Sequence, residues 1–505
     1  MIIEREILSK LEQWKGSSDR SPLIIQGARQ IGKSWIVKEF GQTHYKHTAI
    51  FNFDKQEELK SIFERTKDIK RIIGDLELYT NVPLKEEETL IFFDEIQECK
   101  PALNALKYFK EDAPNYHIIA AGSLLGVAIN RKSKSDKEAS SQSSNTFPVG
   151  KVSFLQMYPV TFREYLRMSD SSLMRQTELR LKDLEPLPEI LFNKLTEQYR
   201  RYQVCGGLPK PCSNMLDGKG ITQIEKDLAD LTKSYEYDFT KHIDDKDIPR
   251  IKEIWRSIPS QLSRENKKFI FRVIREGARA REYESALDWL VLSGMVYRIY
   301  ACETPLLPLK HYENTSAFKV YVLDQAILRT MAELPPEAVI SKGSLLKEFK
   351  GAAAENFVLG SLLAQGFHLP HYWSISGNKA EVDFLIQDGI DVRPVEVKAE
   401  GNISGQSLKV YQEKYNPKLR VRFSMKNLNI NGNILNIPIF LCDWLKSILD
   451  FASENCSTTS KHIITNRSNA FALAGRKSFG TLTRGDAYAL PRAKCFWAFS
   501  PKNIA

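Results

Sequence analysis

The stretch from Gly27 to Ser34 could hold a polyphosphate. It fits the phosphate-binding pattern G-x-x-x-x-G-K-[ST]. Glycine at both ends of the stretch permits backbone angles that bring peptide N–H groups close to phosphate oxygens. We expect Lys33 to reach the β- and γ-phosphates and Ser34 to ligate Mg²⁺. The residues predicted to bind the nucleotide are Gly27, Ala28, Arg29, Gln30, Ile31, Gly32, Lys33 and Ser34.

Two acids farther along the chain could complete a hydrolytic site. Residues 89–93 are mostly apolar and lead into Asp94 and Glu95. We expect Asp94 to lie beside the Mg²⁺ and Glu95 to polarise the attacking water. An isolated Asp-Glu pair after a strand is more often a polar loop, but the phosphate-binding pattern upstream favours the catalytic interpretation.

Ser123 is the third candidate. It ends the apolar segment that begins at His117, and a small polar residue at such a place can sense the γ-phosphate through a hydrogen bond. The alternative is an N-cap for a helix that begins near Leu124.

These residues need a scaffold of strands and helices. The short apolar run 23–25 is typical of a buried parallel strand, and a helix should follow the loop through Phe40, with Gly41 as its C-cap. Apolar residues at helical spacing predict an amphipathic helix at the N-terminus, with Ile3, Ile7, Leu11 and Trp14 on one side. We therefore predict an α/β fold for the first part of the chain.

A second group of candidate catalytic residues lies in the C-terminal part of the sequence. Two predicted strands, 381–386 and 394–398, are joined at an Asp-Gly turn, so that Glu396 and Lys398 share a face and Asp383 lies on the neighbouring strand. Two carboxylates and a lysine could hold Mg²⁺ and activate water for phosphodiester hydrolysis, with Glu355 as a further ligand. Glu381, on the same face as Asp383, is an extra ligand or a flanking charge. The alternative is a surface ion pair of little energetic weight.

The middle of the chain is predicted to be helical. Gly206–Pro209 breaks the chain, helical patterns cover 221–240 and 248–263, and residues 266–300 read as helix, turn, helix and strand, which suits a winged helix. Its basic residues could contact a phosphate backbone, or they could form a solvated face interspersed with Glu276, Glu282 and Glu284. These basic residues are Lys267, Lys268, Arg272, Arg275, Arg279 and Arg281.

Five motifs in this order resemble a prokaryotic family of AAA-type ATPases with a C-terminal PD-(D/E)xK nuclease-like domain of unassigned function. They are G-A-R-Q-I-G-K-S, F-F-D-E-I-Q-E, A-A-G-S-L-L, Y-P-V-T-F-R-E-Y-L and C-G-G-L-P. The resemblance covers about residues 1–445 and implies ATP as the nucleotide, the winged helix in the middle and the nuclease-like fold at the end. The family usually has Gly-Arg where this chain has Gly150-Lys151, which puts an arginine finger there in doubt, because lysine lacks the bidentate fork of arginine. Arg131 and Arg163 are alternatives, or ordinary surface residues.

Length and composition limit the remaining choices. The 505 residues predict about three or four domains, and the 42% hydrophobic and 27% charged residues are ordinary for a soluble globular protein. With the strand and helix patterns above, we expect a multidomain α/β protein. We expect a P-loop AAA-type ATPase domain (1–200, with a disordered loop at 130–146), a helical and winged-helix module (201–315), a restriction-endonuclease-like domain (316–450) and a disordered tail (451–505). Scattered cysteines, and the lack of a secretory signal or a membrane span, predict reduced thiols and a cytoplasmic location.

The first hypothesis for function is Mg²⁺-dependent ATP hydrolysis that switches a DNA-associated C-terminal module. One alternative is an ATP-gated DNA endonuclease of a mobile-element or defence system, and another is a non-enzymatic, nucleotide-dependent scaffold. The net charge of +10 admits DNA as a partner. The sequence leaves open whether the chain forms a homo-oligomer.

Overall fold

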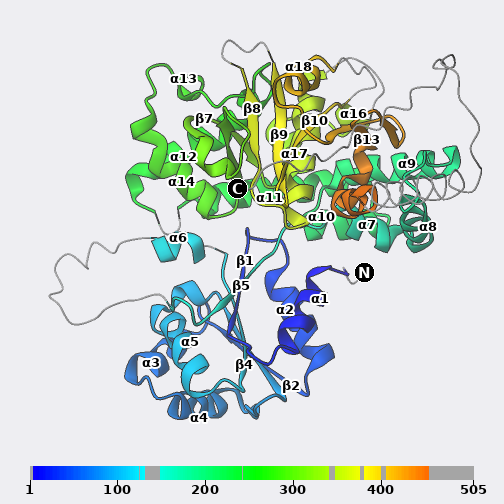
Figure 1. Cartoon of the computed structure of the whole chain (residues 1–505). Coiled ribbons are helices and arrows are strands. Elements are labelled where there is room, and N and C mark those ends of the chain that lie inside the picture. The colour runs from blue at the N-terminus through cyan, green and yellow to red at the C-terminus, as the bar shows by residue number, and fades with distance from the viewer. Residues whose placement is uncertain are drawn as a thin grey trace, which may run out of the picture. The chain divides into compact units, whose positions relative to one another are not determined.

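The computed structural model describes residues 4–123, 125–130, 148–240, 243–340, 347–375, 380–399 and 405–453 (Figure 1). The predicted disordered loop 130–146 lies outside these ranges except for residue 130. The predicted disordered tail lies outside them except for residues 451–453, which continue a helix.

The N-terminal part is built on a parallel sheet of five strands. They are β1 (Leu23–Gln26), β2 (His47–Asn52), β3 (Thr89–Asp94), β4 (His117–Ala121) and β5 (Ser153–Gln156). Their order is β2-β3-β4-β1-β5, and every neighbouring pair is parallel. Strand β3 is buried along its whole length, which explains why its sequence is almost continuously apolar. Since β4 separates β1 from β3, its carboxyl end lies between the phosphate loop and the acidic pair.

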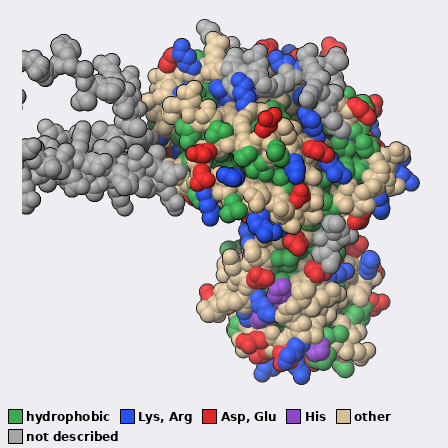
Figure 2. Space-filling view, turned by 90° about the vertical axis from the view of Figure 1, so that its right-hand side faces the viewer, with side chains coloured by type: hydrophobic (Ala, Val, Ile, Leu, Met, Phe, Trp, Pro, Cys, Tyr) green, Lys and Arg blue, Asp and Glu red, His purple; other side chains and the backbone are tan. Residues whose placement is uncertain are grey.

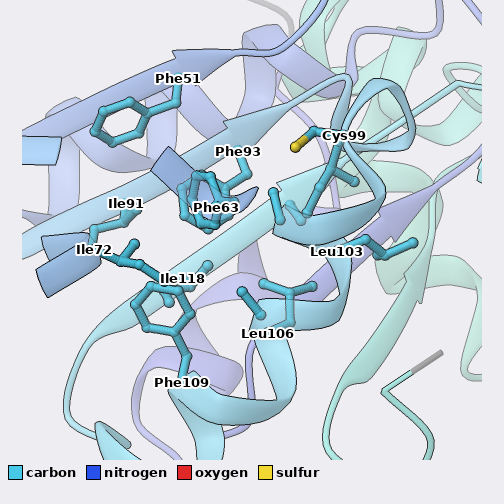
Figure 3. Close-up of a cluster of buried hydrophobic side chains, with 14 of the residues drawn as sticks. Phe51, Phe63, Ile72, Ile91, Phe93, Cys99, Leu103, Leu106, Phe109 and Ile118 are labelled. Atoms are coloured by element: carbon cyan, nitrogen blue, oxygen red, sulfur yellow. The ribbon is translucent and has the colours of Figure 1, made fainter. Parts of the chain in front are cut away.

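Helices cover both faces of this sheet (Figure 1). On one face lie α3 (Glu58–Arg65), α4 (Ile69–Thr80) and α5 (Lys100–Asp112), and on the other lie α1 (Ile7–Lys15) and α2 (Lys33–His44). The core beneath the first face is aromatic: Phe93 packs edge-on against Phe63, with ring centroids 5.7 Å apart (Figure 3). In α1, Ile7, Leu11 and Trp14 are buried as the amphipathic pattern predicts, while Ile3 lies outside the described residues.

The prediction that Gly41 caps α2 is wrong. The helix continues to His44 and ends at Tyr45. Gly41 is instead a packing residue, because a Cβ there would lie 2.5 Å from Oγ1 of Thr48 on β2. Glycine therefore lets α2 lie close against the sheet.

Most of the chain between residues 125 and 292 is helical, and helices are present where helical patterns were predicted over 221–240 and 248–263. Its helices are α6 (Leu125–Asn130), α7 (Phe162–Ser169), α8 (Ser171–Leu181), α9 (Glu189–Cys205), α10 (Pro209–Leu216), α11 (Ile221–Asp238), α12 (Ile248–Leu262), α13 (Phe271–Ile274) and α14 (Ala280–Leu292). Strands β6 (Val296–Cys302) and β7 (Glu313–Val322) follow as an antiparallel pair. The predicted order of helix, turn, helix and strand over 266–300 is thus present in α13, α14 and β6.

A second, mixed sheet organises the C-terminal part. Its eight strands have the order β12-β13-β11-β10-β9-β8-β6-β7, so the pair β6 and β7 forms one edge. The other strands are β8 (His371–Ser374), β9 (Glu381–Asp388), β10 (Asp391–Val397), β11 (Arg420–Ser424), β12 (Asn429–Asn431) and β13 (Ile434–Pro438). The helices are α15 (Gln325–Met331), α16 (Glu337–Ile340), α17 (Lys347–Ala364) and α18 (Gln406–Tyr415).

The apolar run 437–441 has the residue types of a strand, but only its first two residues belong to one. Strand β13 ends at Pro438, and a 3₁₀ helix, Ile439–Trp444, follows it. Proline has no N–H to continue the ladder, which explains the early end. The residues after Pro438 are nevertheless buried, so their apolar run reflects burial and not a strand.

The described cysteines, Cys99, Cys205, Cys212, Cys302 and Cys442, are buried and form no disulfide with one another. No helix within the described ranges is long and apolar enough to cross a membrane.

Candidate nucleotide site

The phosphate loop joins the end of β1 to the start of α2. Gly27 has φ 144° and Gly32 has φ 95°, angles that side chains with a Cβ rarely adopt. A Cβ on Gly27 would also lie 2.5 Å from the carbonyl oxygen of Met157. The two glycines therefore permit the loop to turn sharply and lie against β5, which leaves the first N–H groups of α2 free to face an anion.

Lys33 folds back over the loop. Its Nζ donates hydrogen bonds to the carbonyl oxygens of Gly27 (2.9 Å) and Ala28 (2.6 Å), and the side chain is buried. Burial lowers the pKa of Lys33 to about 8, although Glu95 and Asp94 act in the opposite direction. An ammonium held this way can exchange loop carbonyls for phosphate oxygens, which are stronger partners.

Asp94 lies at the carboxyl end of β3, beside the start of α2. Its Oδ1 accepts a hydrogen bond from the hydroxyl of Ser34 (2.8 Å), and its Oδ2 accepts one from Nδ2 of Asn52 (3.2 Å). Burial raises the pKa of Asp94 above its ordinary value, against the hydrogen bonds from Ser34 and Asn52. The structure therefore brings together the two predicted Mg²⁺ ligands. Asn52, from the end of β2, was not predicted, since nothing in its local sequence marks it.

Glu95 and Ser123 also meet. Glu95 has a left-handed backbone (φ 52°), and its Oε2 accepts hydrogen bonds from Nε2 of Gln97 (2.6 Å) and from the hydroxyl of Ser123 (3.3 Å). Gln97 lies on a 3₁₀ turn, Ile96–Glu98, directly after the acidic pair. Its position in F-F-D-E-I-Q-E was the only signal that could have indicated it. The carboxylate is thus held in place beside the loop by two neighbours.

Arg29, in the middle of the phosphate loop, connects the site to helix α11. Its Nε donates to Oγ of Ser123 (3.0 Å), and its guanidinium forms an ion pair with Asp238. The hydroxyl of Tyr235, one turn earlier on α11, donates to the carbonyl oxygen of Arg29 (3.1 Å). A hydrogen-bonded chain therefore runs from Glu95 through Ser123 and Arg29 to α11. The loop pattern did not predict this connection, because its partners are about two hundred residues away in sequence.

These residues fit a nucleoside triphosphate with Mg²⁺. Glycines shape the loop, Lys33 supplies a cation, and Ser34 with Asp94 offers the hard oxygen atoms that Mg²⁺ prefers. Water and phosphate oxygens would complete the octahedral shell of such an ion, as is usual for Mg²⁺ in proteins.

The described residues considered as arginine fingers make contacts with other parts of the chain. Arg163 pairs with Glu178 (2.6 Å) and Glu6 (3.4 Å) and lies over the ring of Trp444, so it is engaged within the chain. Lys151 pairs with Glu111 at 3.1 Å. Arg131 lies outside the described residues.

The predicted C-terminal site is also assembled in space. Asp383 on β9 accepts a hydrogen bond from the backbone N–H of Val397 on β10 (2.7 Å), and Nζ of Lys398 lies 3.3 Å from Oε1 of Glu396. Glu355, buried on α17, accepts a hydrogen bond from the hydroxyl of Tyr321 (2.8 Å) and forms an ion pair with Lys267. Burial and the charge of Glu355 raise the pKa of Asp383 to about 7.

Cations not predicted to belong to this cluster neutralise its carboxylates. Lys319 on β7 is fully buried and forms an ion pair with Glu381, and Nε of Arg422 lies 3.0 Å from Oε2 of Glu396. Burial acts to raise the pKa of Glu355, but Lys267 and Lys319 outweigh it and hold this pKa below its ordinary value. Among the residues that the structure describes, no group of three or more His, Cys, Asp and Glu side chains is arranged to hold a metal ion. As it stands, the cluster does not fit Mg²⁺.

Comparison with known families gives matches to three parts of the chain. Residues 19–166 match the model of an AAA domain. The N-terminal part has the α/β fold of an AAA-type P-loop ATPase. Residues 196–338 match a domain of unknown function, DUF8612, and residues 350–441 match another, DUF4143. A comparison with curated proteins found no match.

Solved structures with some likeness include the Walker-type ATPase PABY2304 of Pyrococcus abyssi, with 15% identity and a TM-score of 0.40 over 66% of this chain and 96% of that one. The Aeropyrum pernix ORC1 protein in complex with DNA has 11% identity and a TM-score of 0.27 over 68% and 95% of the two chains. RuvB of Thermotoga maritima has 14% identity and a TM-score of 0.23 over 60% and 90%. Because these TM-scores are low, the nucleotide-binding assignment depends on the AAA-domain match and on the residues of the loop.

Proposed function

We propose that this protein binds ATP with Mg²⁺ and hydrolyses it, and that the hydrolysis cycle switches the position of helix α11 and the modules beyond it. The observation that carries the proposal is the hydrogen-bonded chain from Glu95 through Ser123 and Arg29 to Asp238. The AAA-type fold of the N-terminal part supports it.

Each residue has a separate task in this proposal. Lys33 and the N–H groups at the start of α2 bind the phosphates, and Ser34 with Asp94 binds the cation. The cation, when bound, neutralises phosphate charge. Glu95 accepts a proton from the attacking water, and its hydrogen bond from Gln97 (2.6 Å) fixes the carboxylate. Ser123 exchanges its bond to Glu95 for one to the γ-phosphate.

Two variants test the proposal. Lys33→Ala should abolish ATP binding measured by calorimetry, whereas Glu95→Gln should leave binding intact and lower turnover about 10²- to 10⁴-fold. Exposed Lys38→Ala, on the same helix, is the matched control. Turnover that survives in purified Lys33→Ala protein would disprove the assignment of this loop.

The DNA-associated version of the switch has less support. Arg275 pairs with Glu282 at 4.0 Å, and Arg298 pairs with Glu284 and Asp288 at 2.7 Å each, so acids interrupt the basic face around α14. Lys, Arg, Asp and Glu side chains are also interspersed on the molecular face in Figure 2. DNA remains a proposed partner because the net charge of the whole chain, +10, admits an anionic partner. A salt-dependent shift of labelled duplex DNA tests it.

The alternative of an ATP-gated endonuclease has one supporting observation, the convergence of Asp383, Glu396 and Lys398 on paired strands. The poor fit of the cluster to Mg²⁺ favours the other alternative, a scaffold that binds partners without cutting DNA. A plasmid-cleavage assay with and without ATP separates them. Plasmid cutting by the parent that is lost in Lys398→Ala would establish the nuclease. The absence of cutting by the parent would favour the scaffold.

A further inference from the structure

The C-terminal cluster is electrically balanced by the chain itself. Its carboxylates belong to Glu355, Glu381, Asp383 and Glu396, and its cations to Lys267, Lys319, Lys398 and Arg422. Four carboxyl groups therefore face four cations, and since the pKa of Asp383 is about 7, the cluster has no excess of negative charge at neutral pH. A divalent cation added to this arrangement would leave two uncompensated positive charges in a largely buried region, which is strongly unfavourable.

Lys267 differs from the other cations in its origin and in its backbone. It comes from the segment between α12 and α13, outside the sheet that carries the acids, and its φ is 49°, a left-handed angle that is costly for a residue other than glycine. Its ammonium nevertheless reaches Glu355, and only 15% of the lysine side chain and 3% of the glutamate side chain are exposed. The fold thus holds a residue with an unfavourable backbone angle where its positive charge meets a buried carboxylate.

By contrast, the other cations belong to the sheet. Lys319 lies on β7, and Arg422 on β11, beside β10. Lys267 lies outside the strands, although its segment is attached to β7 by a backbone hydrogen bond from Phe269 to Phe318 (2.8 Å), so its charge can be removed by substitution of one side chain without changing a strand. Of the cations in this cluster, Lys267 alone is supplied by a connection between helices.

We propose that Lys267 occupies the cation position of the C-terminal cluster and keeps divalent cations out. With Lys267 in place, the cluster has no excess of negative charge, because Glu355, Glu381 and Glu396 are each paired with a cation. With Lys267 withdrawn, Glu355 and Asp383 have an excess of negative charge and bind a divalent cation. This inference concerns the C-terminal cluster and does not depend on ATP hydrolysis.

The test is Mn²⁺ binding to the full chain without nucleotide, measured by the electron paramagnetic resonance of free Mn²⁺. All proteins carry Asp94→Asn, which silences the nucleotide site. The parent and Lys268→Met, the exposed neighbour, should show no saturable site up to about 1 mM. Lys267→Met should gain one site at least about tenfold tighter, and Asp383→Asn should remove that gain.

Two results would overturn the proposal. One is a saturable site in the parent that Asp383→Asn abolishes, and the other is a folded Lys267→Met protein that gains no site. If Lys267→Met does not fold, the rates at which individual lysines of the parent are acetylated, measured by mass spectrometry, test the proposal instead. Lys267 should react more slowly than Lys268 with and without Mn²⁺, and exposure of Lys267 by Mn²⁺ would contradict exclusion.

Discussion

The hydroxyl of Ser34 donates a 2.8 Å hydrogen bond to Oδ1 of Asp94, across from the start of helix α2 to the end of strand β3. The two residues are sixty positions apart, and the parallel sheet brings them together. In the absence of a cation this bond satisfies a buried carboxylate whose pKa burial has raised. In the proposed function, a cation held by Ser34 and Asp94 would take the place of this hydrogen bond.

Asp94→Asn should remove the dependence of nucleotide binding on Mg²⁺. The amide keeps an oxygen for Ser34 but has no charge to offer the metal. We expect Mg²⁺ to tighten ATP binding at least about tenfold in the parent and less than about twofold in the variant. The heat stability of the variant should change little, because removal of a buried charge offsets the loss of the hydrogen bond from Asn52. Equal Mg²⁺ dependence in both proteins would exclude Asp94 as a ligand.

Nucleotide affinity should fall above pH 8. The pKa of Lys33 in the free protein is about 8, and the lysine must carry its proton when phosphates bind. Above pH 8, binding therefore takes up a proton, and the dissociation constant should rise by up to about tenfold per pH unit. Calorimetry at pH 8.5 in buffers of different ionisation enthalpy measures the proton uptake. Lys33→Arg, which stays charged, should show none in the same range.

Gly122→Ala should impair hydrolysis without abolishing binding. A Cβ on Gly122 would lie 2.2 Å from Oε1 of Gln97, so the glutamine must move and release Glu95. We expect turnover to fall about tenfold or more and the affinity for ATP to change little. Gly74→Ala, in α4, is the matched control: no atom lies within 4 Å of its Cβ, and stability should rise by about 0.5–1 kcal/mol. Unchanged turnover in Gly122→Ala would show that Gln97 does not position Glu95.

Acid should destabilise the protein through His117. Burial, with Arg20 and Lys15 nearby, lowers the pKa of this histidine to about 4, and the hydroxyl of Tyr45 is 2.7 Å from its Nδ1. Because the folded pKa lies below the ordinary value of about 6.5, the unfolded chain binds the proton first as the pH falls. The stabilisation is complete above pH 6.5 and is lost between pH 6.5 and pH 4, about 1–3 kcal/mol in total.

Denaturant unfolding of the parent and of His117→Gln across this range measures the effect. Glutamine keeps a polar group near Tyr45 and does not titrate. The stability of the parent relative to the variant should therefore decline toward pH 4, and parallel curves would contradict the assignment.

The phosphate loop and the acidic strand could be predicted because both are local patterns, in which the chemistry and the element that carries it are adjacent in sequence. Gly41 shows where local rules fail: a glycine near a helix end resembles a cap, but the packing of Thr48 determines its role. Asn52 and Asp238 could not be found this way. Their contacts depend on which strands and helices become neighbours, and a single sequence carries no direct signal of that.

The C-terminal cluster shows the same limit more sharply. The acids and Lys398 follow from the alternation of two strands, but Lys267 reaches them from a segment that the sequence indicated only as basic. The strand pattern that predicts the acidic residues of the cluster therefore cannot show that Lys267 neutralises one of them.

The contacts of helix α11 with Arg29 also allow the position of the helix to influence the phosphate loop. Tyr235 and Asp238 contact the loop that is proposed to bind the phosphates. The conformation of the loop is therefore energetically coupled to the position of the helix. A molecule that binds the protein and shifts α11 should therefore change the affinity for nucleotide. Thermodynamic reciprocity requires that nucleotide changes the affinity for that molecule by the same factor. A partner of this protein can therefore be found by screening for molecules that alter its ATP affinity, without knowledge of where they bind.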